Sequence, residues 1–294
     1  MPDQSLPKSR WPRIRLSLRA LMILVLLLGG GLGWIERSVR IQRDAVAAIE
    51  RTGAGVRYDW QFRNGIPNSK GKPWAPRWLV DLLGVDYFGS PAYVIARTQK
   101  MDDATLVAVG RLSRLERLDI ATSSVTDFGL ANLKALKRLR YLDLAATQVS
   151  DAGLMHLKGL ASLTFLDLNA TQVGDVGLLN LNGLTRLETL CLRHTIVSDA
   201  GLVHVTGMDH LKSLDLSDTM VGDAGMAHLS GLTSLQLLCL GDTRVSDAGL
   251  PHLTALPKLQ ELDFRCIRNT GAITITVAGL NELQKAMPTL TIDH

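Results

Sequence analysis

Cysteine is scarce in this sequence, which has three, Cys191, Cys239 and Cys266, among 294 residues. None of them forms the C-x-x-C pair that is typical of zinc and redox sites. The chain also lacks a Walker A loop, a G-x-G-x-x-G turn, an H-E-x-x-H helix and a G-x-S-x-G elbow. These absences remove the usual sequence evidence for nucleotide binding, metalloproteolysis and serine hydrolysis. We therefore expect a protein that is not an enzyme and that needs no metal ion or other cofactor.

Excess charge is missing from most of the chain as well. Residues 1–43 carry eight Lys/Arg against two acidic residues, a net charge of +6, whereas residues 44–294 carry 24 against 26. The positive net charge of the whole chain, +4, therefore comes from the N-terminal segment. Domains that bind nucleic acid usually have a strongly basic surface, so we expect no nucleic-acid partner.

A 24-residue repeat runs from residue 115 to residue 258. Each unit reads L-x-x-L-x-L-x-x-T-x-V-x-D-x-G-L-x-x-L-x-x-L with small variations, and we number its positions from the first leucine. The first six positions alternate apolar and polar residues, which predicts a strand with one buried face. The later apolar residues are three apart, which predicts a short helix with one buried side. A repeat of this length indicates a solenoid of stacked coils. Six units begin at Leu115, Leu139, Leu163, Leu187, Leu211 and Leu235.

Three columns of the repeat are predicted to be structural. Position 9 is Ser or Thr, whose hydroxyl can bond the backbone of a turn. Position 13 is always aspartate, from Asp127 to Asp247, and is expected to cap the helix that begins there. Position 15 is always glycine, from Gly129 to Gly249, which indicates close packing between coils.

This pattern resembles the leucine-rich repeat superfamily, and the segment T-x-V-[ST]-D-A-G-L is similar to a bacterial variety with short helices. The resemblance covers residues 91–292. It implies an α/β solenoid with parallel strands on the concave face and short helices on the convex face. Residues 91–114 are expected to form a degenerate first coil. The last coil starts at Leu259 and has about six extra residues near 268–274.

The N-terminal segment has the layout of a membrane anchor. Residues 1–19 form a basic tail, and residues 20–35 form a charge-free apolar run. Adding Leu16 to Leu18 gives roughly the 20 residues that cross a bilayer, if Arg19 reaches back to the interface. The positive-inside rule then places the tail in the cytoplasm and the repeats outside it. With this layout the chain resembles membrane-anchored repeat proteins of planctomycete-type bacteria. A cleaved signal peptide is the alternative.

Residues 36–90 are predicted to form a small α/β cap on the first coil. A helical stripe runs from Ile41 to Ile49, and Val56, Tyr58 and Trp60 alternate as a strand would. Residues 62–76 indicate a loop, and residues 76–83 indicate a short amphipathic helix.

Positions 3, 5, 7 and 8 are predicted to face a partner on the concave side. Position 5 is mostly aspartate, and carboxylates repeated every ~4.8 Å suit a basic partner, cations or solvent. Position 8 places His194, Asp218, Asp242 and Cys266 along a line of ~14 Å, so they cannot converge on one metal ion. The predicted partner-binding residues are Tyr141, Asp143, Phe165, Asp167, Arg193, His194, Asp215, Asp218 and Asp242.

These features predict a single-pass membrane protein whose extracytoplasmic repeats bind a protein or an envelope polymer. One alternative is a structural or adhesive component of the cell envelope. Another is a cytosolic adaptor, because the repeat also resembles the one behind eukaryotic F-box domains, although the chain shows no F-box-like three-helix module. The sequence leaves the ligand and the oligomeric state open.

Overall fold

The computed structural model describes the backbone of residues 18–63, 66–68, 70–265 and 275–293. Side chains are described from Gly33 onward, except at Arg63 and Pro67. The chain divides into two compact units, residues 1–41 and 42–294, and their boundary falls within helix α1 (Leu18–Glu50).

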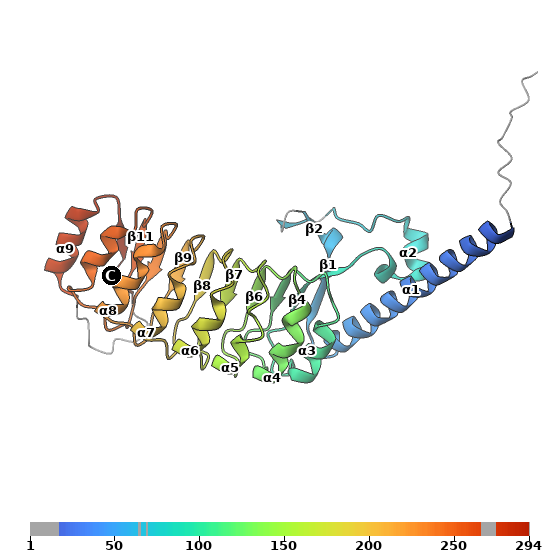
Figure 1. The fold of residues 1–294 in the computed structure, drawn as a ribbon, viewed down its shortest axis with the longest axis horizontal. Coiled ribbons are helices and arrows are strands. Elements are labelled where there is room, and N and C mark those ends of the chain that lie inside the picture. Colours follow the sequence, from blue (N-terminus) through green and yellow to red (C-terminus); the bar gives the residue numbers. More distant parts are fainter. Residues whose placement is uncertain (1–17, 64–65, 69, 266–274, 294) are drawn as a thin grey trace, which may run out of the picture. The chain divides into compact units, whose positions relative to one another are not determined.

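Within the described part of the second unit, one ten-stranded sheet organises the fold (Figure 1). Strands β4 to β12 are parallel and adjacent in chain order, and β1 pairs antiparallel with β4 at one edge. From β4 to β11, paired residues are 24 positions apart, as in Tyr141 opposite Phe165, so the predicted sequence repeat is also the structural repeat. The strands are β1 (Gly55–Tyr58), β4 (Pro91–Ile95), β5 (Arg117–Asp119), β6 (Tyr141–Asp143), β7 (Phe165–Asp167), β8 (Thr189–Cys191), β9 (Ser213–Asp215), β10 (Leu237–Cys239), β11 (Glu261–Asp263) and β12 (Thr291–Asp293).

The last coil is longer than the others. Leu262 pairs with Ile292, 30 residues further along the chain, so this coil contains six residues more than the repeat. The predicted position of the insertion, residues 268–274, lies outside the described residues.

Short helical segments line the side of the solenoid away from the strands (Figure 1). Most α-helices there are four residues long, and 3-10 turns extend several of them, which confirms the predicted short helices. The segments are α3 (Asp103–Val109), α4 (Asp127–Leu130), α5 (Asp151–Leu154), α6 (Asp175–Leu178), α7 (Asp199–Leu202), α8 (Asp223–Met226) and α9 (Val277–Ala286), with 3-10 turns η3 (Ala131–Ala135), η4 (Leu179–Leu181), η5 (Val203–Val205), η6 (Ala227–Gly231) and η7 (Leu250–Ala255).

A continuous apolar core fills the space between strands and helical segments. In the coil that starts at Leu139, all seven apolar repeat positions have no exposed surface: Leu139, Leu142, Leu144, Val149, Leu154, Leu157 and Leu160. Each such side chain contributes about 1.5–3 kcal/mol when it is fully buried. The predicted first coil belongs to the same core, because Val94, Met101 and Leu106 are fully buried.

The repeated aspartates join neighbouring coils, which corrects the expectation that each caps its own helix. Asp127 is the first residue of α4, and Thr126 is the capping residue. Oδ1 of Asp127 accepts a hydrogen bond from the Ser150 N–H at 2.7 Å, and Oδ2 accepts one from the Ser150 hydroxyl at 2.5 Å. The same Asp-to-next-coil bond recurs at Asp103–Thr126, Asp151–Gly174, Asp175–Ser198, Asp199–Gly222, Asp223–Ser246 and Asp247–Thr276.

The glycine and hydroxyl columns also serve the stack. A Cβ added to Gly177 would lie 2.5 Å from Oδ1 of Asp151 in the preceding coil, so any larger residue would displace this carboxylate. The hydroxyl of Thr147 donates to the carbonyl of Leu144 at 2.6 Å, and the threonines at 171, 195, 219 and 243 repeat this bond. Ser123 is an exception: its buried hydroxyl has no hydrogen-bond partner among the described residues.

The segment before the first coil packs on the solenoid. Ala45 and Ile49 of α1 are buried in the core of the coils. The predicted strand ends at Tyr58, because Trp60 lies in the 3-10 turn η1 (Asp59–Gln61). The expected loop contains a short hairpin of β2 (Phe62–Arg63) and β3 (Ile66–Pro67). The predicted short helix is confirmed as α2 (Arg77–Leu83), and the 3-10 turn η2 (Val85–Tyr87) follows it.

Among the residues whose side chains are described, none belongs to a helix both long and apolar enough to cross a bilayer. The predicted basic tail up to residue 17, and the side chains of most of the apolar run, residues 20–32, lie outside those residues. The membrane anchor therefore stays a prediction.

Candidate functional site

One face of the sheet presents the side chains that the repeat does not dictate. Position 4 of each strand is buried in the core, so positions 3 and 5 point to the other side. We call the residues at these two positions of β4 to β11 the strand face. They are Tyr93, Arg117, Tyr141, Phe165, Thr189, Ser213, Leu237 and Glu261 at position 3, and Ile95, Asp119, Asp143, Asp167, Cys191, Asp215, Cys239 and Asp263 at position 5.

A stack of side chains covers the first strands of this face. Cζ of Arg117 lies 3.3 Å from the centroid of the Tyr141 ring. The rings of Tyr141 and Phe165 are parallel within 5°, with centroids 4.1 Å apart. One coil earlier, Tyr93 stacks on Phe62 of β2 at 3.8 Å. These contacts hold the half-buried rings in place, so a partner that binds them loses little side-chain entropy.

The aromatic stack ends at Phe165. One face of its ring is covered by Tyr141, and the next strand places the small side chain of Thr189 beside its other face. Ser213 follows one strand further on. Thr189 and Ser213 are short, and no ring of the described residues stacks on this second face of Phe165.

Five aspartates at position 5 form an acidic row, and an arginine covers its first end. Nε of Arg97 donates to Asp119 at 2.9 Å, and its Nη2 donates to Asp143 at 3.3 Å. Both carboxylates are almost fully buried, with residue exposures of 3% and 4%. The acidic row consists of Asp119, Asp143, Asp167, Asp215 and Asp263.

Asp143, one of the predicted partner-binding residues, is buried under this arginine. Like charges on adjacent strands repel, and Asp119 and Asp143 avoid this repulsion by sharing the guanidinium of Arg97. Arg97 was missed because it lies at position 7 of the degenerate first coil. The signal that could have found it is the need of two neighbouring carboxylates for a cation.

The middle of the acidic row has no such cation. Asp167 accepts a hydrogen bond from the Asn169 N–H at 2.9 Å, and Asp215 accepts one from the Ser217 N–H at 2.9 Å. Neither forms an ion pair with a described residue. Burial, aided by the neighbouring carboxylates, raises the pKa of Asp167 to about 6. This carboxylate is therefore the part of the face that gains most from an added cation.

The predicted residues at position 8 lie on the turns that follow the strands. Nδ1 of His194 is 2.7 Å from Oδ2 of Asp218, and both line an open hollow of about 650 Å³. All three predicted residues there have left-handed backbone, with φ of 55° at His194 and 57° at Asp218 and Asp242. Asp and His are enriched in this conformation, but Thr122, Ala146 and Ala170 adopt it at the same position of other coils, so the backbone alone does not select the residue type.

The predicted site residues therefore fall into two groups. Tyr141, Asp143, Phe165, Asp167 and Asp215 share the strand face, whereas His194, Asp218 and Asp242 lie on the adjoining turns. Arg193, at position 7, belongs to neither group: its backbone N–H donates to the side chain of Asn169 at 2.7 Å, and its carbonyl accepts from the Ala170 N–H at 2.8 Å. No cluster of three or more His, Cys, Asp or Glu suited to a metal ion occurs among the described residues.

The two cysteines of the strand face are partly buried. Burial strongly raises the pKa of Cys191 and raises that of Cys239 to about 12, so both thiols stay neutral at physiological pH. Both are free thiols. Cys266 lies outside the described residues.

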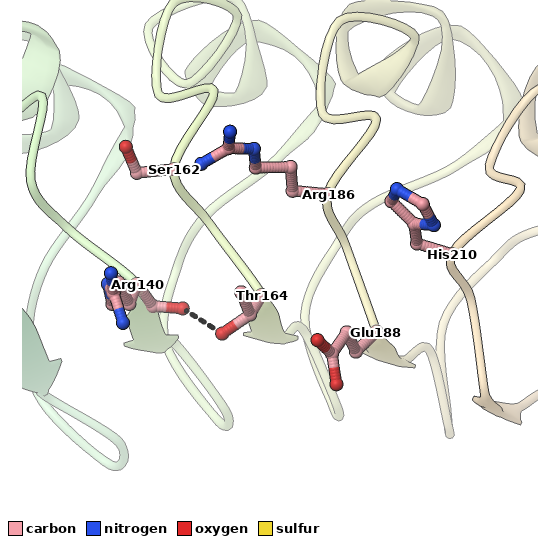
Figure 2. Close-up of a pocket in the computed structure, with 6 residues that line it drawn as sticks. All are labelled: Arg140, Ser162, Thr164, Arg186, Glu188 and His210. Atoms are coloured by element: carbon pink, nitrogen blue, oxygen red, sulfur yellow. Dashed lines mark hydrogen bonds between the residues drawn. The ribbon is translucent and has the colours of Figure 1, made fainter. Parts of the chain in front are cut away.

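A second hollow, of about 280 Å³, lies at the edge where the strands begin. Figure 2 shows the side chain of Arg186 extending toward Ser162 of the preceding coil. The hydroxyl of Thr164 donates to the carbonyl of Arg140 at 3.1 Å. Glu188, the acidic residue of this lining, is paired with Lys212 at 2.7 Å. Two arginines and a neutralised glutamate make this edge suitable for an acidic group.

Fold and face together define a repeat solenoid with a preordered surface on its strands. Residues 208–230 match the family model described as "Leucine Rich repeat". The neighbouring coils have the same 24-residue pattern and pair in the same register. The coils therefore have the leucine-rich repeat fold.

A solved structure similar to this chain is that of internalin C2 from Listeria monocytogenes. The two are 24% identical, the match covers 61% of this chain and 81% of internalin C2, and the TM-score is 0.48. No curated protein matches the chain.

Proposed function

We propose that this protein is a non-catalytic scaffold that binds a partner protein through its strand face while residues 20–35 hold it in a membrane. The observation that carries the proposal is the end of the aromatic stack at Phe165 beside Asp167, a carboxylate with no ion-pair partner among the described residues. Stacked repeats of this kind commonly serve binding through the extended surface that their coils form.

The chemistry of this place favours an arginine or lysine of the partner. A guanidinium stacked on Phe165 would repeat the contact that Arg117 makes with Tyr141 at 3.3 Å. It would lie above Thr189, with Asp167 on one side and Asp215 two strands further on. A cation–π contact with an adjacent carboxylate is stronger than either alone in a partly desolvated site.

Neutral side chains also occur at position 5 of the strands. Cys191 and Cys239 occupy position 5 in strands whose backbones pair as regularly as the others. The fold thus does not require an aspartate at this position. A half-buried carboxylate without a cation costs stability, which supports a role for Asp167 in binding.

Crosslinking in intact membranes tests the proposal. A photoreactive residue in place of Thr189 should give one saturable adduct with a partner protein, whereas the same residue in place of Lys134 on the helical side should give none. Phe165→Ala should abolish the adduct. Phe128→Ala, which removes an 85% exposed phenylalanine on the opposite side, should leave it unchanged.

Two outcomes would reject the binding role. An adduct that survives Phe165→Ala would show that the strand face does not recognise the partner. The absence of any saturable adduct, together with a loss of envelope integrity on deletion, would favour the structural or adhesive alternative. Recovery of the chain in the soluble fraction without detergent would reject the anchor and favour a cytosolic adaptor.

A further inference from the structure

The segment before the first coil exposes apolar side chains of unusual size. Trp74 is 79% exposed, Trp78 67% and Leu82 72%. Trp78 and Leu82 lie on α2 four residues apart, so they project from the same side of the helix. Side chains of this size on an open surface usually mark a contact with another molecule or with lipid.

Cations accompany these side chains. Lys70, Lys72 and Arg77 are exposed within the same segment, and Asp81 is its single acidic residue, 3.8 Å from Arg77. Tryptophan is enriched at the interface between lipid and water, and lysine and arginine bind anionic headgroups. A protein partner or a second copy of this chain would not require both features together.

Hydrogen bonds fix the end of α2 to the start of the second unit. Nη2 of Arg43 donates to the carbonyl of Leu83 at 3.0 Å, and Nε of Arg43 lies 3.5 Å from Asp86. Nε2 of Gln42 donates to the carbonyl of Gly89 at 3.0 Å. The seven residue-to-residue steps from Ile35 to Gln42 span at most about 25 Å even when fully extended. An anchor that ends at Ile35 therefore keeps α2 near the membrane, whatever path the chain takes between them.

We propose that residues 70–83 dock on the lipid surface of the membrane that holds the anchor. Trp74, Trp78 and Leu82 enter the boundary between headgroups and acyl chains, and the three cations contact anionic headgroups. This second attachment restrains the solenoid at the bilayer instead of leaving it on a free tether. The inference depends on the proposed membrane anchor.

Fluorescence quenching by lipid tests the docking with the full chain in vesicles. Each variant keeps one tryptophan and has the others replaced by phenylalanine, so its emission reports on the surroundings of that one side chain. The vesicles contain phosphatidylglycerol and phosphatidylcholine with brominated or ordinary acyl chains. Bromination should reduce the emission of the Trp78 variant roughly twofold, as expected for a side chain at the lipid interface. The variant that keeps only the partly buried Trp60 is the matched control and should change little.

A variant that keeps only Trp34 separates this inference from the anchor. Quenching of Trp34 without quenching of Trp78 would overturn the docking and leave the anchor intact. A chain that does not float with the vesicles, and whose Trp34 is not quenched, would overturn the anchor and the docking with it. Emission of Trp78 that follows the protein-to-lipid ratio, but not bromination, would assign the segment to a second copy of the chain and overturn the docking.

Charge reversal supplies an independent readout. Lys70→Glu, Lys72→Glu and Arg77→Glu combined should reduce quenching of Trp78 on phosphatidylglycerol vesicles and leave quenching of Trp34 unchanged. Unchanged quenching of Trp78 in this variant would contradict the contact with anionic headgroups.

Discussion

The ends of the acidic row differ from its middle, although the backbone is the same throughout. At the first end, Arg97 binds Asp119 and Asp143. At the last end, Arg265 lies 2.7 Å from Asp263 and 3.5 Å from Asp293. Its guanidinium lowers the pKa of Asp263, whereas burial raises the pKa of Asp167 to about 6.

This contrast separates what the repeat needs from what it leaves open. The inter-coil bonds of Asp127 and its equivalents recur along the helical side with nearly constant geometry. Position 5 varies by contrast. It is a carboxylate paired with an arginine at Asp143, a carboxylate without an ion pair at Asp167, and a thiol at Cys191. Function is therefore expected where charge is left uncompensated, in the middle of the row next to Phe165.

The largest effect is expected when the cation of the first end is removed. Arg97→Ala leaves two almost fully buried carboxylates without their shared guanidinium, and we expect a loss of about 2–3 kcal/mol of unfolding free energy in urea. Arg265→Ala is the matched control, and its more exposed pairs should contribute clearly less, because solvent screens them. Equal losses would show that the two ends do not differ in the way that their burial indicates.

A new carboxylate in the middle should be the next most costly change. Cys191→Asp would place three uncompensated aspartates on consecutive strands, and we expect a loss of about 1–2 kcal/mol at pH 8. The loss should shrink toward pH 4, where Asp167, whose pKa is raised to about 6, is protonated and no longer repels its neighbours. A loss independent of pH would point to packing rather than charge. The unfolding free energy at both pH values decides between these explanations.

Neutralising Asp167 should stabilise the fold. The pKa of this carboxyl rises from about 3.9 in an unfolded chain to about 6 in the folded protein. Ionisation therefore lowers stability as pH rises from 4 through 6. Asp167→Asn should gain about 1 kcal/mol above pH 7, reduced by the partial exposure of the side chain, and nothing near pH 4. A destabilised variant at pH 7 would contradict an uncompensated charge.

The smallest of these effects concerns the aromatic stack. Tyr141→Leu keeps an apolar side chain but removes both the stacking on Phe165 and the cation–π contact with Arg117. We expect a loss of about 0.5–1 kcal/mol of stability. Thermal unfolding measures this loss, and Tyr87→Leu, which replaces a tyrosine outside the strand face, is the control. If Tyr141→Leu costs no more than the control, the stack does not order the face.

The repeat was predictable because the residue pattern within each coil determines where its strand and its helix form. The 24-residue period, the buried leucines and the close glycines all follow from local pattern and size, and the structure confirms them. The direction of the bonds from Asp127 was not predictable, since a carboxylate at the start of a helix can cap its own helix or reach the next coil. The left-handed backbone at position 8 was not predictable either, because residue types that rarely adopt it, such as Ala146 and Ala170, share it with His194.

The candidate site was predictable only in outline. Position alone placed Tyr141 and Phe165 on one face, but the burial of Asp143 depends on how far the side chain of Arg97 reaches across two coils. The exposed Trp74 and Trp78 carried no repeat signal at all. The exposure of these side chains in the folded structure is what indicates a role for them.

The central claim is that the uncompensated middle of the acidic row receives a basic side chain of a partner protein. The most direct test compares Asp167→Asn/Asp215→Asn with Asp263→Asn in the membrane crosslinking experiment at Thr189. The account predicts that the adduct disappears when the two middle aspartates are neutralised and persists when Asp263 is neutralised. An adduct that survives the loss of both middle charges would contradict it.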